Sequence, residues 1–257
     1  MNDRLNGKSA VITGASRGIG FAIAQRFALE GANVAMLARG EEELASAAAR
    51  IGERAHPIAC DIGDPDAVRA AFATVADRLG SLDILVNNAA IATPNPLAEA
   101  SDDDLRNEVA VNLLGPLYCM REAVSLMHGS GGADIVNIST EGVKNPYPHL
   151  GFYVATKSAL ETLSAVMRQE LGPTGIRVTT YRSGNVRGTF SRSWSPEARE
   201  RARFAAREAG FYARSGQQIE PEIPAEAILN IVTLSREAQI DLIELGGAAQ
   251  PTDQSRG

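Results

Sequence analysis

The chain has 257 residues, of which 44% are hydrophobic and 22% are charged, and its formal net charge is -6. This is the composition of an ordinary globular protein, and the acidic balance argues against a general nucleic-acid-binding surface. Two cysteines and three scattered histidines predict neither a disulfide scaffold nor a metal site.

The first seven residues are polar and lack the apolar stretch of a secretory signal. No segment approaches the roughly 18 uninterrupted apolar residues that a membrane-spanning helix requires. We therefore expect a soluble, cytoplasmic protein with neither a membrane partner nor a nucleic-acid partner.

Apolar runs of strand length alternate with amphipathic stretches of helix length. A strand at 9–13 leads into a glycine-rich turn, after which Ile19, Ile23 and Phe27 recur on one face of a helix. Further strands are predicted at 33–38, 57–60, 83–86, 134–138, 176–181 and 240–245. Further helices are predicted at 41–51, from Pro65 onward, and at 102–127, 152–171 and 224–235.

This alternation predicts an α/β fold, a doubly wound Rossmann-type parallel sheet of seven strands with helices on both faces. We expect a single NAD(P)-binding domain over residues 1–250 and a flexible tail at 251–257. Residues 187–222 break the strand–helix rhythm directly after the end of a strand. We expect this insertion to form a lid over the substrate.

Three glycines, Gly14, Gly18 and Gly20, lie between the first strand and the first helix. Glycine at position 14 permits a tight turn, and the other two let the backbone approach a pyrophosphate at the helix N-terminus. The spacing differs from the standard G-x-G-x-x-G pattern. The turn nevertheless predicts a cradle for the phosphates of a dinucleotide.

The end of the second strand indicates which dinucleotide is bound. It reads Leu37-Ala38-Arg39, with no acidic residue before Glu41 to accept a hydrogen bond from a ribose 2′-hydroxyl. Arg39 can pair with a 2′-phosphate, and Arg17 in the glycine turn supplies a second cation. NADP(H) is expected in preference to NAD(H), unless both arginines are only solvated surface residues.

Tyr153 and Lys157 lie four residues apart, on one face of the helix predicted at 152–171. A free tyrosine has a pKa of about 10, and a nearby ammonium lowers the pKa by favouring the phenolate. A phenol tuned in this way can exchange a proton with a carbonyl oxygen. Beside a dinucleotide cradle, the pair indicates hydride-transfer chemistry.

Ordered motifs over residues 7–247 resemble those of the short-chain dehydrogenase/reductase family. They are Thr13-Gly14-x-x-x-Gly18-x-Gly20, Cys60-Asp61-Ile62, Asn87-Asn88-Ala89-Ala90, Val111-Asn112, residues 135–140 and Tyr153-x-x-x-Lys157. The resemblance implies an enzyme that interconverts a small-molecule carbonyl and a secondary alcohol with NAD(P), Tyr153 acting as acid or base. It also implies a homodimer or a homotetramer.

The resemblance further implies the site residues. Asn112 would hold a water that passes protons toward Lys157, and Thr140 would hydrogen-bond the developing alkoxide. The implied catalytic residues are Asn112, Thr140, Tyr153 and Lys157, with no metal ligand. The implied cofactor-binding residues are Gly14, Ser16, Arg17, Gly18, Ile19, Gly20, Arg39, Asp61, Ile62, Asn87, Ala89, Tyr153, Lys157 and Val186.

Three positions depart from the family pattern. Thr140 replaces the usual serine, and the adjacent Ser139 is an alternative hydroxyl, although strand alternation points it to the other face. Ala90 and Ser183 replace a usual glycine and proline. These departures leave a second hypothesis open, a nucleotide-binding regulatory or sensor protein with little or no turnover.

Overall fold

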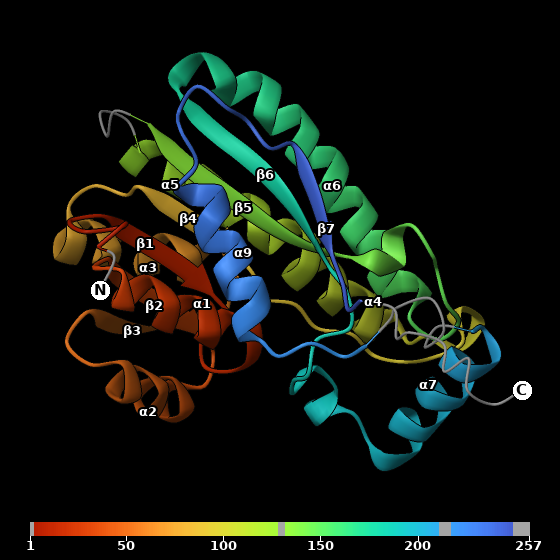
Figure 1. Cartoon of the computed structure of the whole chain (residues 1–257). Coiled ribbons are helices and arrows are strands. Elements are labelled where there is room, and N and C mark those ends of the chain that lie inside the picture. Colours follow the sequence, from red (N-terminus) through yellow and green to blue (C-terminus); the bar gives the residue numbers. More distant parts are fainter. Residues whose placement is uncertain (1–2, 128–131, 211–216, 249–257) are drawn as a thin grey trace, which may run out of the picture.

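The computed structural model describes residues 3–127, 132–210 and 217–248. Within them, seven parallel strands form one sheet in the order β3-β2-β1-β4-β5-β6-β7 (Figure 1). The predicted fold class is therefore confirmed. The strands are β1 (Ser9–Thr13), β2 (Asn33–Ala38), β3 (Ala55–Ala59), β4 (Ile84–Asn87), β5 (Ala133–Thr140), β6 (Ile176–Ser183) and β7 (Leu242–Leu245).

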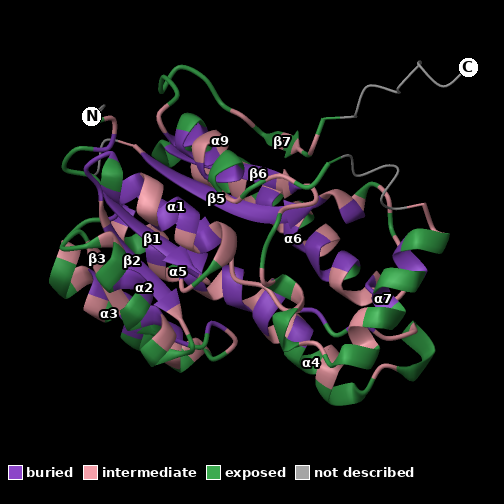
Figure 2. Ribbon diagram, turned by 60° about the horizontal axis from the view of Figure 1, so that its bottom comes forward, coloured by how far each residue is buried: buried purple, intermediate pink, exposed green. Residues whose placement is uncertain are grey.

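Helices cover both faces of this sheet because successive strand residues point to opposite sides. Ile12 packs into the hydrophobic cluster to which α1 (Gly18–Leu29), α2 (Glu41–Ile51) and α9 (Glu222–Val232) contribute. Its neighbour Val11 packs into the opposite cluster, with α3 (Pro65–Leu79), α5 (Gly115–Met127) and α6 (Gly151–Leu171). Figure 2 shows the central strands buried between helices that expose their outer faces, whereas the edge strand β7 is partly exposed.

The strand order reverses beside β1, which pairs with β2 on one side and with β4 on the other. In doubly wound sheets, ligands bind at the carboxyl ends of the strands at this switch point. Strands β5 and β6 run longer than expected because they stay paired from Ala133↔Ile176 to Thr140↔Ser183. Their extra length brings Thr140 and Ser183 to the same edge of the sheet.

The single helix predicted at 102–127 is divided in the structure. A π-helical turn, Ala110–Leu114, joins α4 (Asp102–Val109) to α5. Pro116 lacks a backbone N–H, and in a regular α-helix its ring would clash with the carbonyl of residue 112. The turn before the proline therefore widens into a π-helical turn, as happens at many functional sites. This turn carries Asn112, whose side chain is buried.

The insertion, residues 187–222, leaves the sheet after β6. Its described part contains η5 (Phe190–Ser193) and α7 (Pro196–Glu208), and Figure 1 shows α7 standing apart from the sheet. Residues 211–216 of the insertion and the tail at 251–257 lie outside the described residues. No helix in the described ranges has the length and apolarity needed to cross a membrane.

Candidate active site

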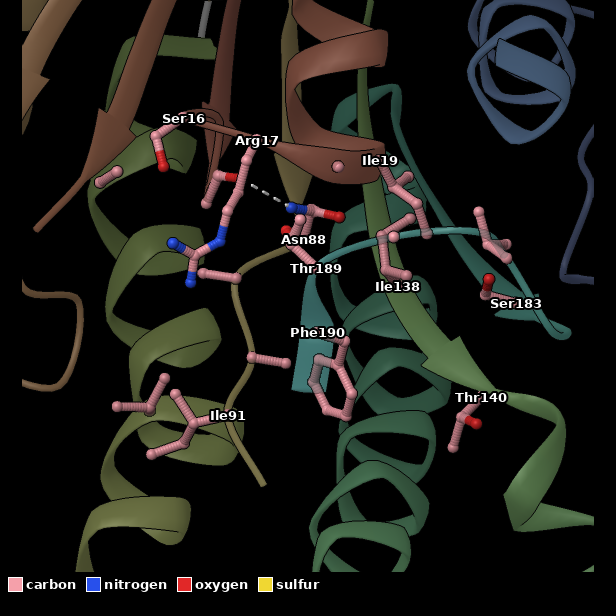
Figure 3. Close-up of a pocket in the computed structure, with 18 of the residues that line it drawn as sticks. Ser16, Arg17, Ile19, Asn88, Ile91, Ile138, Thr140, Ser183, Thr189 and Phe190 are labelled. Atoms are coloured by element: carbon pink, nitrogen blue, oxygen red, sulfur yellow. Dashed lines mark hydrogen bonds between the residues drawn. The ribbon is translucent and has the colours of Figure 1, made fainter. Parts of the chain in front are cut away.

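A cleft of about 560 Å³ opens at the carboxyl ends of the central strands. It gathers the glycine turn, the ends of β2, β4 and β5, the start of α6 and the first part of the insertion (Figure 3). Most of the predicted site residues line it: Gly14, Ser16, Arg17, Gly18, Ile19, Arg39, Asp61, Ile62, Ala89, Thr140, Tyr153, Lys157 and Val186. Gly20, Asn87 and Asn112 are not among the lining residues.

The glycine turn is shaped by two different constraints. At Gly14, with φ of +66°, an added Cβ would lie 2.8 Å from Ala89 Cα, so glycine is needed for close packing. At Gly18, with φ of +59°, an added Cβ would meet nothing within 4 Å. Glycine is needed there for the left-handed backbone conformation.

The N-terminus of α1 is suited to an anion. Arg17 is the N-cap residue, with an extended backbone and no side-chain capping hydrogen bond, and the first turn contains no acidic residue. The first backbone N–H groups of a helix lack intrahelical partners and carry the positive end of the helix dipole. Because Arg17, Gly18 and Ile19 line the cleft, these residues fit a bound pyrophosphate.

The residues after β4 are fixed to the glycine turn. Thr13 Oγ1 accepts hydrogen bonds of 3.0 Å from the backbone nitrogens of both Asn88 and Ala89. Asn88 Nδ2 donates to the carbonyl of Thr13 at 2.9 Å. The cleft is thus lined by Asn88, which belongs to the Asn87-Asn88-Ala89-Ala90 motif but was not among the expected cofactor-binding residues. Asn87 is buried and instead donates to Asn137 Oδ1 at 2.8 Å.

Tyr153 lies at the start of α6, beside the end of β5. Tyr153, Thr140 and Tyr147 all line the cleft, and the Thr140 hydroxyl partly offsets the burial that raises the pKa of both tyrosines. Ser139 points to the other face, as strand alternation requires, and its Oγ donates to Glu161 Oε1 at 2.6 Å. The hydroxyl beside Tyr153 is therefore that of Thr140.

Lys157 is buried one turn further along α6, and its Nζ donates to the Ile138 carbonyl at 2.8 Å. Burial penalises the ammonium and lowers the pKa of Lys157 to about 8. Burial also raises the pKa of Tyr153 far above its ordinary value, with smaller contributions from Tyr147 and Glu108. The expectation that Lys157 lowers the pKa of Tyr153 is wrong for this structure, because desolvation of the phenolate dominates.

Asn112 does not line the cleft but supports a residue that does. Its Oδ1 accepts from the Ile91 backbone nitrogen at 2.9 Å, and its Nδ2 donates to the Ile91 carbonyl at 2.8 Å. The same Nδ2 lies 3.2 Å from Thr156 Oγ1 on α6. Asn112 therefore fixes the extended segment at Ile91, which lines the cleft, and ties it to α6.

Glu108 lies one turn before Asn112 and is a polar residue that the motifs did not identify. Its Oε1 accepts from the Thr93 backbone nitrogen at 2.6 Å, and its side chain is buried. Its Oε2 is buried without a hydrogen-bond partner among the described residues. Burial, reinforced by Asp104, raises the pKa of Glu108 to about 7. Glu108 lies four residues before Asn112, a spacing that places both side chains on one face of a helix. This spacing is the feature of the sequence from which Glu108 could have been predicted.

Two aromatic residues of the insertion reach the site. The ring of Phe190 lies 5.3 Å from that of Tyr153 and 5.9 Å from that of Trp194. Trp194 Nε1 donates to the Ala92 carbonyl at 2.7 Å, which fastens the insertion to the segment after β4. Figure 3 shows Phe190 between Ile91 and Thr140. Phe204, on α7, is instead largely exposed.

The two arginines expected to select the cofactor both have acidic neighbours. Arg39 is exposed, and its Nη1 lies 3.9 Å from Asp61 Oδ2. Arg17 Nη1 lies 3.1 Å from Glu43 Oε2, at the start of α2. Glu43 also lines the cleft, and no motif in the sequence marks this residue.

Comparisons with known proteins agree with this geometry. A family model described as short chain dehydrogenase matches residues 8–199. A 3beta-hydroxysteroid dehydrogenase from Mediterraneibacter gnavus is 38% identical over 67% of the chain and 64% of its own length. A sorbitol dehydrogenase from Cereibacter sphaeroides is 37% identical over 72% and 73%, respectively.

Solved structures show a similar likeness. A 3-ketoacyl-(acyl-carrier-protein) reductase from Brucella melitensis, complexed with NADH, superposes with a TM-score of 0.85 and 26% identity over 95% of this chain and 98% of that one. A short chain dehydrogenase from Burkholderia cenocepacia, in complex with NADP, gives a TM-score of 0.82 and 29% identity over 95% and 98%.

Proposed function

The chain belongs to the short-chain dehydrogenase/reductase family, whose oxidoreductases act on CH–OH donors, and we propose that it interconverts a carbonyl and a secondary alcohol with NADP(H). Tyr153 is the acid and base of this reaction. The observation that carries the proposal is the shared wall of the cleft that Tyr153, Thr140 and Lys157 line together. The uncapped N-terminus of α1 lies along the same cleft.

The cofactor would be held by residues that the cleft already gathers. The first turn of α1 takes the pyrophosphate, Asp61 and Ile62 take the adenine side, and Tyr153 and Lys157 border the nicotinamide side. The cofactor, when bound, supplies or accepts the hydride. Side chains of the protein carry out the rest of the chemistry: they transfer the proton and stabilise the charge that develops on the substrate oxygen.

In the reduction direction, Tyr153 donates a proton to the substrate oxygen. Its raised pKa keeps the phenol protonated at neutral pH, which is the form a proton donor must have. The Thr140 hydroxyl stabilises the same developing oxygen charge. Lys157, with a pKa of about 8, remains mostly protonated at pH 7 and holds a positive charge behind the phenol. Asn112 keeps Ile91 in place on the opposite wall.

The preference for NADP(H) is supported by Arg39 and Arg17, which line the cleft near the end of β2. The Arg39–Asp61 pair is long and exposed, so it is worth little and leaves the guanidinium available to a phosphate. Fluorescence titration of the protein with NADPH and NADH tests this preference. Arg39→Asp should weaken NADPH binding and spare NADH, and equal NADPH affinity in the variant would contradict the assignment.

The substrate is a small molecule, and the insertion is the lid that covers it. The substrate end of the cleft is lined by Tyr147, Phe190 and Ile91, so an apolar or ring-shaped carbonyl compound suits it. A panel of ketones and alcohols, followed by NADPH absorbance, tests for turnover. The relatives are named as dehydrogenases and reductases, so we do not propose the sensor alternative.

We also propose a cytoplasmic homodimer or homotetramer. Val166 on α6 is an apolar residue with 46% of its surface exposed, as a helix–helix contact between copies would require. Light scattering on the purified protein distinguishes these assemblies from a monomer.

A further inference from the structure

Three donors converge on the carboxylate of Glu43. Its Oε2 lies 3.1 Å from Arg17 Nη1 and 3.3 Å from Ser16 Oγ. Its Oε1 lies 3.2 Å from Nη1 of Arg192, which belongs to η5 in the insertion. The donors come from segments far apart in sequence, the glycine turn and the insertion, and they meet on one anion that α2 supplies.

Arg17 and Glu43 line the main cleft, as Tyr153 does. A hollow of about 400 Å³ adjoins the main cleft and shares Ser16, Arg17, Gly18 and Glu43 with it. Arg192 and Arg50 also line the hollow, and the Arg50 guanidinium lies 4.3 Å from the centre of the Phe21 ring. Three arginines thus face two carboxylates there, those of Glu43 and Glu222, which leaves the region positive.

Two guanidinium groups and a hydroxyl form the kind of donor set that recognises a phosphate. The Glu43 side chain is 40% exposed and that of Arg192 is 66% exposed. Ion pairs this exposed are worth at most about 1 kcal/mol, so displacing the carboxylate is easy. A phosphate ester brings up to twice the charge and three acceptor oxygens, which favours it over the monoanionic carboxylate in the same place.

We propose that Glu43 competes with the cofactor's 2′-phosphate for Arg17 and Arg192, and that Arg192 of the insertion becomes a ligand of that phosphate. The choice of anion rests on the proposed NADP(H) function. Arg192 and Phe190 lie in the same short turn, η5, and Phe190 contacts Tyr153. The phosphate and the catalytic phenol therefore engage the same turn, so the 2′-phosphate of NADP(H) ties η5 to the glycine turn, which NAD(H) cannot do.

Titration with nucleotide fragments tests the proposal without turnover. Adenosine 2′,5′-bisphosphate and adenosine 5′-monophosphate differ only in the 2′-phosphate, and calorimetry gives an affinity for each. Glu43→Gln frees both arginines and should tighten bisphosphate binding by about three- to tenfold, whereas Arg192→Ala should weaken it by about the same factor. Neither variant should change the affinity for the monophosphate. Arg192→Lys should recover only part of the loss, because it lacks the planar fork.

Matched controls exist on the same elements. Glu42→Gln removes a neighbouring exposed charge of α2, and Arg203→Ala removes an exposed arginine of α7, and neither should alter either affinity. The proposal is overturned if Arg192→Ala leaves bisphosphate binding unchanged. It is also overturned if Glu43→Gln weakens monophosphate binding, which would make Glu43 a ribose-binding acid that selects NAD(H). The carbonyl panel tests the proposed function by turnover, whereas the fragment affinities test the roles of Arg192 and Glu43 without turnover. A failure of one proposal can therefore be distinguished from a failure of the other.

Discussion

Replacing Glu108 with glutamine should remove a pH-dependent loss of stability. The side chain is 3% exposed, and burial raises its pKa from an ordinary 4.5 to about 7. A carboxyl with a higher pKa in the folded chain holds its proton more tightly there. The contribution of the Glu108 carboxyl to the free energy of unfolding is therefore fully present below pH 4.5 and is lost as the pH rises through 7. At about 1.4 kcal/mol for each pKa unit, the whole shift is worth about 3 kcal/mol.

The assay is the free energy of unfolding from urea titrations at pH 5 and pH 8. Between these pH values the wild type should lose about 2 to 3 kcal/mol through Glu108, and Glu108→Gln should not. Glutamine keeps the shape of the side chain and an acceptor for the Thr93 nitrogen. The control is Glu170→Gln, which removes an exposed carboxyl on α6.

At each pH, the free energy of unfolding of the wild type is subtracted from that of Glu108→Gln. Because all other titrating groups are shared by the two proteins, the difference reports on Glu108 alone. The reasoning is refuted if that difference is the same at pH 5 and at pH 8, because Glu108 would then ionise as an ordinary exposed carboxyl. The variant should also lower the pKa of Tyr153, because the charge of Glu108 raises it.

Three further outcomes are expected. Thr140→Val should lower kcat by about a hundredfold at saturating NADPH, whereas Thr140→Ser keeps the hydroxyl and should stay within about threefold of wild type. Equal losses in the two variants would contradict the role of the Thr140 hydroxyl in stabilising the substrate oxygen. Gly14→Ala should reduce the free energy of unfolding by about 2 kcal/mol or more, because Gly14 has a positive φ and an added Cβ would also meet backbone atoms. Gly80→Ala should reduce it by about 1 kcal/mol, because Gly80 has a positive φ but its added Cβ would meet nothing. Lys157, with a pKa of about 8 rather than 10.5, should add about 2 kcal/mol of stability as the pH rises from 8 to 10, and Lys157→Met should lack this rise.

The fold followed from the sequence because local and global signals agree. The proline at the start of α3, Pro65, and the apolar run at 9–13 both predict the observed elements. A helix break at Gly115-Pro116 follows from the sequence, but the place of the π-helical turn, Ala110–Leu114, does not, because the clash of Pro116 acts one turn upstream of the proline.

The site was predicted less completely, and the reason is spatial. Motifs identified Tyr153 and Thr140, but they did not show that burial raises the pKa of the phenol. Glu108 and Glu43 carry no motif, and each gains its importance from partners that only the folded chain supplies. Charge–charge contacts between distant segments are not encoded in a local pattern.

The most direct test of the central claim compares the wild type with Tyr153→Phe in NADPH oxidation against one active carbonyl compound, with NADPH affinity measured on the same samples. Phenylalanine keeps the ring that contacts Phe190 and removes only the proton donor. Turnover should fall by about a hundredfold or more while NADPH affinity stays within about twofold. Undiminished turnover in the variant would contradict the assignment of Tyr153 as the acid.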